Sequence, residues 1–149
     1  MKMQYLTTHD IVWINTTVSG TIQTFDYLIL EAAMASQYQY GDSTDVLTQA
    51  GNLLQKLLLA KPFEVGNRRT ALISTLTFLN ANNYATIATD EEIAKSFIAI
   101  ESGINTSAEV IGAMAAPAQK PLPGMTLRQL ITHECNHHST ALGLLGTND

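Results

Sequence analysis

The chain has 149 residues, the length of one ordinary domain, and 46% of them are hydrophobic whereas 14% are charged. This composition excludes a disordered protein, and the lack of an apolar run of about 18 residues argues against a membrane-spanning helix. The net charge is −5 with only eight Lys and Arg residues, so nucleic acid is not an expected partner. The single cysteine, Cys135, cannot form an internal disulfide and no secretory leader is recognisable, so we expect a cytoplasmic protein.

The first part of the chain predicts two helices. Thr7 or Thr8 can cap the first helix, which carries apolar residues on one face and ends near Gly20. Asp26 can cap the second helix, because its carboxylate can accept from the free backbone N–H groups of the first turn. We expect the stretch between these two helices to be a loop.

Two longer helices follow, one on each side of residues 61–70. Ser43 or Thr44 can cap the third helix. Its apolar residues follow the three-and-four spacing of a buried stripe: Val46, Leu47, Ala50, Leu53, Leu54, Leu57 and Leu58. The fourth helix should end within residues 80–83, which read Asn-Ala-Asn-Asn, since asparagine tolerates the left-handed conformation of a helix end. Both helices are expected to lie in the core.

The second half begins with residues 84–88, a short segment with β propensity that cannot be assigned to a sheet without a partner. Thr89 and Glu92 form a capping-box pattern, which predicts a helix that runs to Gly103. Ser107 can cap a further helix, which should end before Pro117.

Residues 116–125 hold three of the four prolines of the chain and predict an extended surface linker. Thr126 can cap a last helix that ends at Gly146. Together the elements predict an all-α fold, a compact bundle of six to seven helices. Residues 1–116 form the helical domain, and residues 117–149 form the linker and a helix that packs on the same domain.

Residues 61–70 read Lys-Pro-Phe-Glu-Val-Gly-Asn-Arg-Arg-Thr and hold three of the eight basic residues. The run from Gly66 opens a helix, and the first turn of a helix has free N–H groups and the positive end of the helix dipole. Both features suit an anion such as phosphate. By composition alone, the same residues are also consistent with an ordinary basic loop between two helices. In that case Pro62 and Gly66 would serve only to break the helices.

The flanks of this segment favour the first interpretation. A leucine-rich helix leads into Lys61-Pro62-Phe63-Glu64-Val65-Gly66-Asn67-Arg68-Arg69-Thr70-Ala71-Leu72, and the next helix ends in Phe78-Leu79-Asn80-Ala81-Asn82-Asn83-Tyr84. This arrangement resembles the Fic/Doc family and, more closely, its Doc or death-on-curing branch, whose signature is His-x-Phe-x-Asp/Asn-Ala/Gly-Asn-Lys/Gly-Arg. The opening Tyr5-Leu6-Thr7 followed by Asp10-Ile11 is similar as well. The resemblance covers residues 5–115 and is strongest over 50–84.

The resemblance implies a compact all-α fold in which the loop binds the phosphates of a nucleotide. Members of this family transfer AMP or a phosphoryl group from a nucleoside triphosphate to a hydroxyl of a target protein, so ATP and magnesium are the implied cofactors. In bacteria, the Doc branch commonly supplies the toxin of a toxin–antitoxin pair. A nucleotide, a protein target and an antitoxin are therefore the implied partners.

The resemblance also assigns roles to individual positions. Phe63 would anchor the loop in the core, and Gly66 would allow the backbone to approach phosphate closely. Asn67 and Arg69 would hold phosphate oxygens, and Arg68 stands where the Doc branch has lysine. The implied phosphate-binding set is therefore Gly66, Asn67, Arg68 and Arg69.

Two positions depart from the signature, and both carry chemistry. Lys61 stands in the place of the catalytic histidine, and an unperturbed lysine, with a pKa of about 10.4, has no lone pair to accept a proton at neutral pH. Val65 stands in the place of the carboxylate or amide that positions magnesium, and a valine offers no oxygen ligand. Glu64 is one residue away, so its side chain is expected to point elsewhere. We expect weak or absent transfer, in which case the chain would act as a non-catalytic interaction module.

A second candidate site lies in the last helix, where His133, Glu134 and His137 match the zinc pattern His-Glu-x-x-His. The two histidines share one helical face and can bind zinc or nickel, with Glu134 as the base of a metallohydrolase. No third ligand is evident in the sequence. Adventitious metal binding by a histidine-rich tract, or a polar helix surface without any metal, are the alternatives.

Overall fold

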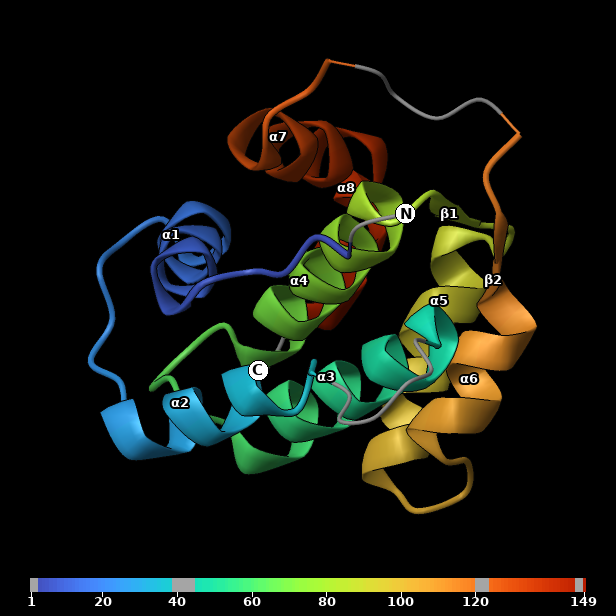
Figure 1. Cartoon of the computed structure of the whole chain (residues 1–149). Helices are drawn as coiled ribbons and strands as arrows, with labels where there is room; N and C mark the ends of the chain where they lie inside the picture. The colour runs from blue at the N-terminus through green and yellow to red at the C-terminus, as the bar shows by residue number, and fades with distance from the viewer. Residues whose placement is uncertain (1–2, 39–44, 120–123, 147–148) are drawn as a thin grey trace.

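The computed structural model describes residues 3–38, 45–119, 124–146 and 149. Within these ranges the chain forms eight helices and one two-stranded sheet, which confirms the all-α fold class (Figure 1). The elements in chain order are α1 (Thr8–Ser19), α2 (Tyr27–Ala35), α3 (Val46–Ala60), α4 (Asn67–Ala81), β1 (Tyr84–Thr86), α5 (Asp90–Glu101), α6 (Ser107–Met114), β2 (Ala115–Pro117), α7 (Leu127–His137) and α8 (Ser139–Leu145). None of the described helices has the length and apolar character that a bilayer crossing requires.

Helix α4 lies at the centre of the bundle (Figure 1). Eleven of its 15 residues are buried, because α1, α3 and α7 pack against it from different sides. Its sequence combines apolar residues with small hydroxyl residues such as Ser74 and Thr75 and has no charged residue after its first turn, as expected for a helix without a solvent face. The loop that precedes α4 is therefore attached to the most buried element of the fold.

Four predicted helix starts agree with the structure, and of the two candidates for the first helix the cap is Thr7. Thr7, Asp26, Thr89 and Thr126 each accept a hydrogen bond from a backbone N–H of the first helical turn. Helix α6 begins one residue away from the prediction, because Thr106 rather than the neighbouring serine is the cap. Such one-residue differences leave the arrangement of the helices unchanged.

The start of α3 also differs from the sequence prediction. The structure caps this helix with Asp45, whose carboxylate accepts from the backbone N–H groups of Leu47 and Thr48. The predicted caps, Ser43 and Thr44, lie outside the described residues.

The β-prone segment after α4 has a partner that the sequence did not reveal. Strand β1 pairs with β2 in antiparallel register, with Tyr84 opposite Pro117 and Thr86 opposite Ala115. The first residues of the predicted linker are therefore a strand. Each strand has only three residues, so neither would be stable without the other.

The last predicted helix is divided in two. His138 has φ −116° and ψ 33°, which breaks the helical path between α7 and α8. This division raises the number of helices above the predicted six to seven. The break occurs at His138, whose side chain is buried between the carboxylates of Asp90 and Glu134.

Candidate functional site

The 61–70 segment is held against the stretch between α1 and α2. Asp26 N donates to Pro62 O (2.8 Å) and Glu64 N donates to Thr24 O (3.0 Å). The side chain of Phe63 is buried, and its ring lies 5.7 Å from the ring of Phe25. Phe63 thus has the anchoring position that the resemblance implies.

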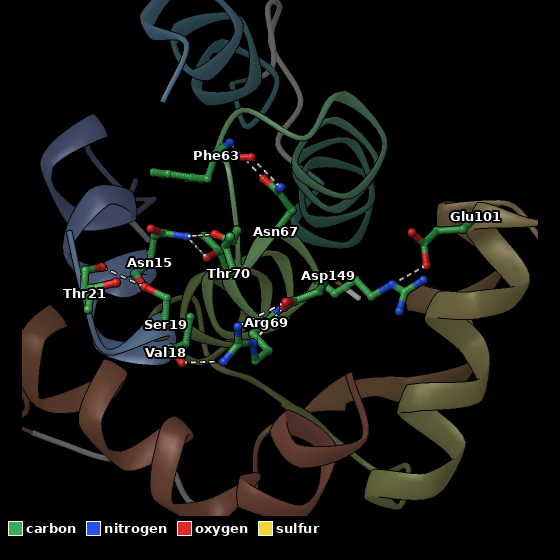
Figure 2. Close-up of polar contacts among 12 residues, drawn as sticks. Asn15, Val18, Ser19, Thr21, Phe63, Asn67, Arg69, Thr70, Glu101 and Asp149 are labelled. Atoms are coloured by element: carbon green, nitrogen blue, oxygen red, sulfur yellow. Dashed lines mark hydrogen bonds and ion pairs between the residues drawn. The ribbon is translucent and has the colours of Figure 1, made fainter. Parts of the chain in front are cut away.

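Asn67, the first residue of α4, closes the loop through its side chain. Its Oδ1 accepts from Phe63 N (2.9 Å), and its Nδ2 donates to Phe63 O (2.7 Å). The residue is 3% exposed, so both ends of the amide are used within the protein (Figure 2). The resemblance implies a side-chain amide that binds phosphate oxygens. In this structure the amide binds the backbone of Phe63 instead, so only the backbone N–H of Asn67 is left to bind an anion at the start of α4.

Gly66 is required at its position for two reasons. Its φ of 86° lies in the left-handed region that other residues rarely adopt. A Cβ atom at this position would also lie 3.0 Å from Nδ2 of Asn15, a buried residue of α1. That Nδ2 donates to Val65 O (2.8 Å) and contacts Oγ1 of Thr70 at 3.1 Å, so Asn15 connects α1 to both ends of the loop (Figure 2).

Arg69 binds the side-chain carboxylate of Asp149, a residue of the same chain. Its Nε and Nη2 donate to the Oδ2 and Oδ1 atoms of Asp149, at 2.7 Å and 3.1 Å. Nη1 donates to Val18 O (2.7 Å), which fixes the plane of the guanidinium (Figure 2). The backbone N–H of Asn67 donates to Asp149 O (3.3 Å), so the start of α4 faces the same residue.

The other two basic side chains of the segment share one acid. Arg68 Nε donates to Glu101 Oε1 (2.8 Å), and Lys61 Nζ lies 4.0 Å from Glu101 Oε2. The side chain of Lys61 is 55% exposed, and its residue has a positive φ of 50° at the end of α3. The segment therefore presents three positive charges to two carboxylates of the same chain.

The residues present do not fit the magnesium ion that the resemblance implies. Val65 is exposed and supplies only its backbone carbonyl, which already accepts from Asn15. The nearby carboxylates, Glu101 and Asp149, are engaged with arginines. Over the described ranges, no group of three or more His, Cys, Asp or Glu residues is arranged to hold a metal.

In the second candidate site, the rings of the two histidines of the zinc pattern lie against each other, while the glutamate contacts Asn80 and His138. The rings of His133 and His137 are stacked, with centroids 5.7 Å apart and planes 8° from parallel. Glu134 is buried, where its Oε1 accepts from Asn80 Nδ2 and its Oε2 lies 3.3 Å from His138 Nε2. Metal binding by the two stacked histidines stays a prediction.

His138 connects the helices of this region, and it was not predicted from the sequence. It is 3% exposed, and its Nδ1 lies 2.8 Å from Oδ1 of Asp90, the first residue of α5. The other oxygen of Asp90 accepts from Ala141 N (3.0 Å) in the first turn of α8. The only sequence signal was a histidine directly after the zinc pattern, and its partner is 48 positions away.

A cavity of about 190 Å³ adjoins this group. Its lining includes His133, Glu134, His137, His138 and Asn80. Burial lowers the pKa of His138, but the hydrogen bonds and charges of Glu134 and Asp90 outweigh it, so the pKa is raised above its ordinary value.

No family model, no curated protein and no solved structure matches this chain. The resemblance to the Fic/Doc family therefore rests on the sequence alone, most strongly on residues 50–84.

Proposed function

We propose that this protein is a Fic/Doc-like protein that binds the phosphate groups of a nucleotide at the start of α4, and that it transfers AMP or a phosphoryl group weakly or not at all. One observation carries the binding part of the proposal. The carboxylate of Asp149 occupies the position between the Arg69 guanidinium and the first turn of α4.

The contacts of the Asp149 carboxylate support an anion as the ligand of this position. Arg69 meets it with two N–H donors in a planar fork, a geometry that suits carboxylates and phosphates equally. The backbone N–H of Arg69 also faces Oδ2, at 3.4 Å, and the helix dipole adds positive potential. A phosphate that displaced Asp149 would find the same donors, and Gly66 removes the side chain that would otherwise crowd the loop.

The transfer part of the proposal rests on Lys61 and Val65. Lys61 is exposed and close to Glu101, and Val65 has no oxygen in its side chain. Phosphoryl and nucleotidyl transfer depend on positioning and on electrostatic stabilisation by a metal, so the loss of the base and of the metal ligand together should be severe. The protein would then act by binding, with a target protein or an antitoxin as the partner that the resemblance suggests.

Calorimetric titration with ATP, with and without magnesium, tests the binding site. We expect Asp149→Asn to bind ATP more tightly than the wild type, because the competing charge is removed while the side-chain shape is kept. Arg69→Lys should bind more weakly in the Asp149→Asn background, because a lysine cannot form the planar fork. Arg128→Lys, on α7, is the matched control and should bind like its parent. An Asp149→Asn protein that binds no ATP would overturn the proposal.

Labelling with radioactive ATP in a cell extract tests the transfer activity. We expect little or no labelled protein with the wild type, and a gain with Lys61→His combined with Val65→Asp in the Asp149→Asn background. The gain should disappear when Arg69 is also replaced by alanine. Strong labelling by the wild type that needs Arg69 would show that the native site is an active transferase.

A further inference from the structure

His133 and His137 lie one turn apart on the same face of α7, with their rings stacked against each other. The ring planes are 8° from parallel, and the ring centroids are 5.7 Å apart. Residues at i and i+4 are neighbours on the surface of a helix, and two histidines at this spacing can bind one metal ion. Because both residues belong to α7, which ends at His137, the folded helix itself sets the spacing of the two imidazoles.

The ring nitrogens of this pair are not engaged elsewhere. Within the part of the chain that the structure describes, no hydrogen bond or ion pair involves the ring nitrogens of His133 or His137. The neighbouring ring of His138 differs, because both of its nitrogens face carboxylates. His133 is half-buried and His137 is exposed, so an ion can reach the pair from solvent. Metal binding would therefore break no hydrogen bond of the fold.

Glu134 does not complete a zinc hydrolase site with these histidines. Its Oε1 accepts from Asn80 Nδ2, and its Oε2 lies 3.3 Å from His138 Nε2, so both carboxylate oxygens are engaged. A hydrolytic zinc site has three protein ligands and a glutamate that is free to activate water. Among the residues that the structure describes, no third His, Cys, Asp or Glu is placed to join the pair. The arrangement therefore suits metal binding and not hydrolysis.

The cavity beside α7 gives room for further ligands of a bound ion. It measures about 190 Å³ and is lined by both histidines, by Asn80 of α4 and by Thr86 of β1. A volume of this size holds several water molecules. Water can therefore occupy the coordination positions that the two imidazoles leave open.

We propose that His133 and His137 bind one divalent ion of a late transition metal, with water from the cavity in its other coordination positions. Imidazole nitrogen is a ligand for Cu²⁺, Ni²⁺ and Zn²⁺. Two nitrogen ligands with water suit Cu²⁺ and Ni²⁺, which accept tetragonal coordination by nitrogen and oxygen, whereas protein sites for Zn²⁺ have three or four side-chain ligands. This site shares no residue with the anion position at Arg69, so it does not depend on the proposed function.

Calorimetric titration of the untagged protein with Ni²⁺ measures the binding. We expect one ion per chain, and competition should show a lower Kd for Cu²⁺ and a higher Kd for Zn²⁺. His137→Gln should raise the Kd of Ni²⁺ at least about tenfold, since changes outside the coordination shell already cost about 10–100-fold in affinity. His9→Gln, which removes a histidine of α1, is the matched control and should keep the wild-type Kd. Equal Kd values for the wild type and His137→Gln would overturn the proposal.

A variant that moves one histidine tests the geometry of the pair and not the number of histidines. His133→Gln combined with Thr132→His keeps four histidines in the chain but places one of the pair on another face of α7. We expect the Kd of Ni²⁺ to rise as it does in His137→Gln. Wild-type affinity in this variant would mean that the histidine-rich tract captures metal without a defined site, and the proposal would fail. Circular dichroism without metal should show the same helix content in all variants, because Thr132 and His137 are exposed.

Electron paramagnetic resonance of the Cu²⁺-loaded protein identifies the ligands. We expect hyperfine splitting from two imidazole nitrogens in the wild type and from one in His137→Gln. Because the spacing of the pair exists only in the folded helix, saturating Ni²⁺ should also raise the Tm of the wild type more than that of His137→Gln. A wild-type spectrum with a single imidazole nitrogen, or an equal change of Tm in both proteins, would overturn the proposal.

Discussion

Arg69 and Asp149 form a bidentate ion pair across 80 positions of the sequence, with the carboxylate 1% exposed and the guanidinium 18% exposed. A buried carboxylate is tolerated only where its hydrogen bonds are made, and here Arg69 makes two of them. The pair thus stabilises the fold and also blocks the position at which we propose phosphate to bind.

Because of this double role, we expect inorganic phosphate to restore part of the stability that is lost when the Asp149 carboxylate is removed. Asp149→Ala should lower the free energy of unfolding by about 1–3 kcal/mol, because Arg69 loses its charged partner in a partly buried setting. Adding phosphate should raise the Tm of this variant more than that of the wild type, since a ligand stabilises the state it binds. Thermal melts in phosphate and in chloride of equal ionic strength measure the difference. An equal shift in both proteins would contradict the prediction.

Gly66 offers a test of the loop geometry. Gly66→Ala should cost about 1–3 kcal/mol, because alanine is strained at a φ of 86° and its methyl group would press on the Asn15 amide at 3.0 Å. Gly112→Ala is the matched control: this glycine lies in α6 with open space around it, so alanine should stabilise by up to about 1 kcal/mol. Urea denaturation of the two variants should give effects of opposite sign. Equal effects would mean that the loop conformation is not held as described.

The parts of the fold that the sequence predicted are those set by neighbours in the chain. Helix caps such as Thr89 and Thr126 act on residues within three positions, and they were identified correctly. The burial of Phe63 agrees with the anchoring role that the resemblance implies.

The missed features all depend on distant partners. Asn15 meets Thr70 across 55 positions, and nothing in the local sequence of α1 distinguishes it from a surface asparagine. His138 and Asp90 have the same difficulty, because His138 lies at the junction of α7 and α8, Asp90 lies in α5, and only the packing of α8 on α5 brings them together. The ion pair of Arg69 with Asp149 was not predicted either, because the two residues are 80 positions apart.

Asn67 distinguishes a structural role from a ligand-binding role. Asn67→Ala should lower stability strongly, by about 1–3 kcal/mol for each backbone group of Phe63 that is left buried and unpaired. Asn136→Ala, at an exposed position of α7, should change stability by less than about 0.5 kcal/mol. Chemical denaturation without any nucleotide measures both variants. A small effect of Asn67→Ala would indicate that its amide serves a ligand instead of the loop.

Cys135 is expected to react slowly with alkylating reagents. Burial, and to a lesser degree the nearby charge of Glu134, raise the pKa of its thiol to about 11, so only about one molecule in a thousand carries the thiolate at pH 8. The rate of iodoacetamide labelling in the native protein should be far below the rate in urea, and Glu134→Gln should increase it. Comparable rates in native and unfolded protein would contradict the burial of this thiol.

The raised pKa of His138 predicts how stability changes with pH. A histidine whose pKa is higher in the folded protein contributes its full stabilisation below the unfolded value, about 6.5, and loses it as the pH rises through the folded value. The difference in free energy of unfolding between wild type and His138→Gln should therefore be largest near pH 6 and decline toward pH 9, because only the wild type releases this proton. Urea denaturation at several pH values gives the difference directly. A difference that grows with pH would mean that His138 is buried as the neutral ring, in which case its contacts with Asp90 and Glu134 could not both be hydrogen bonds.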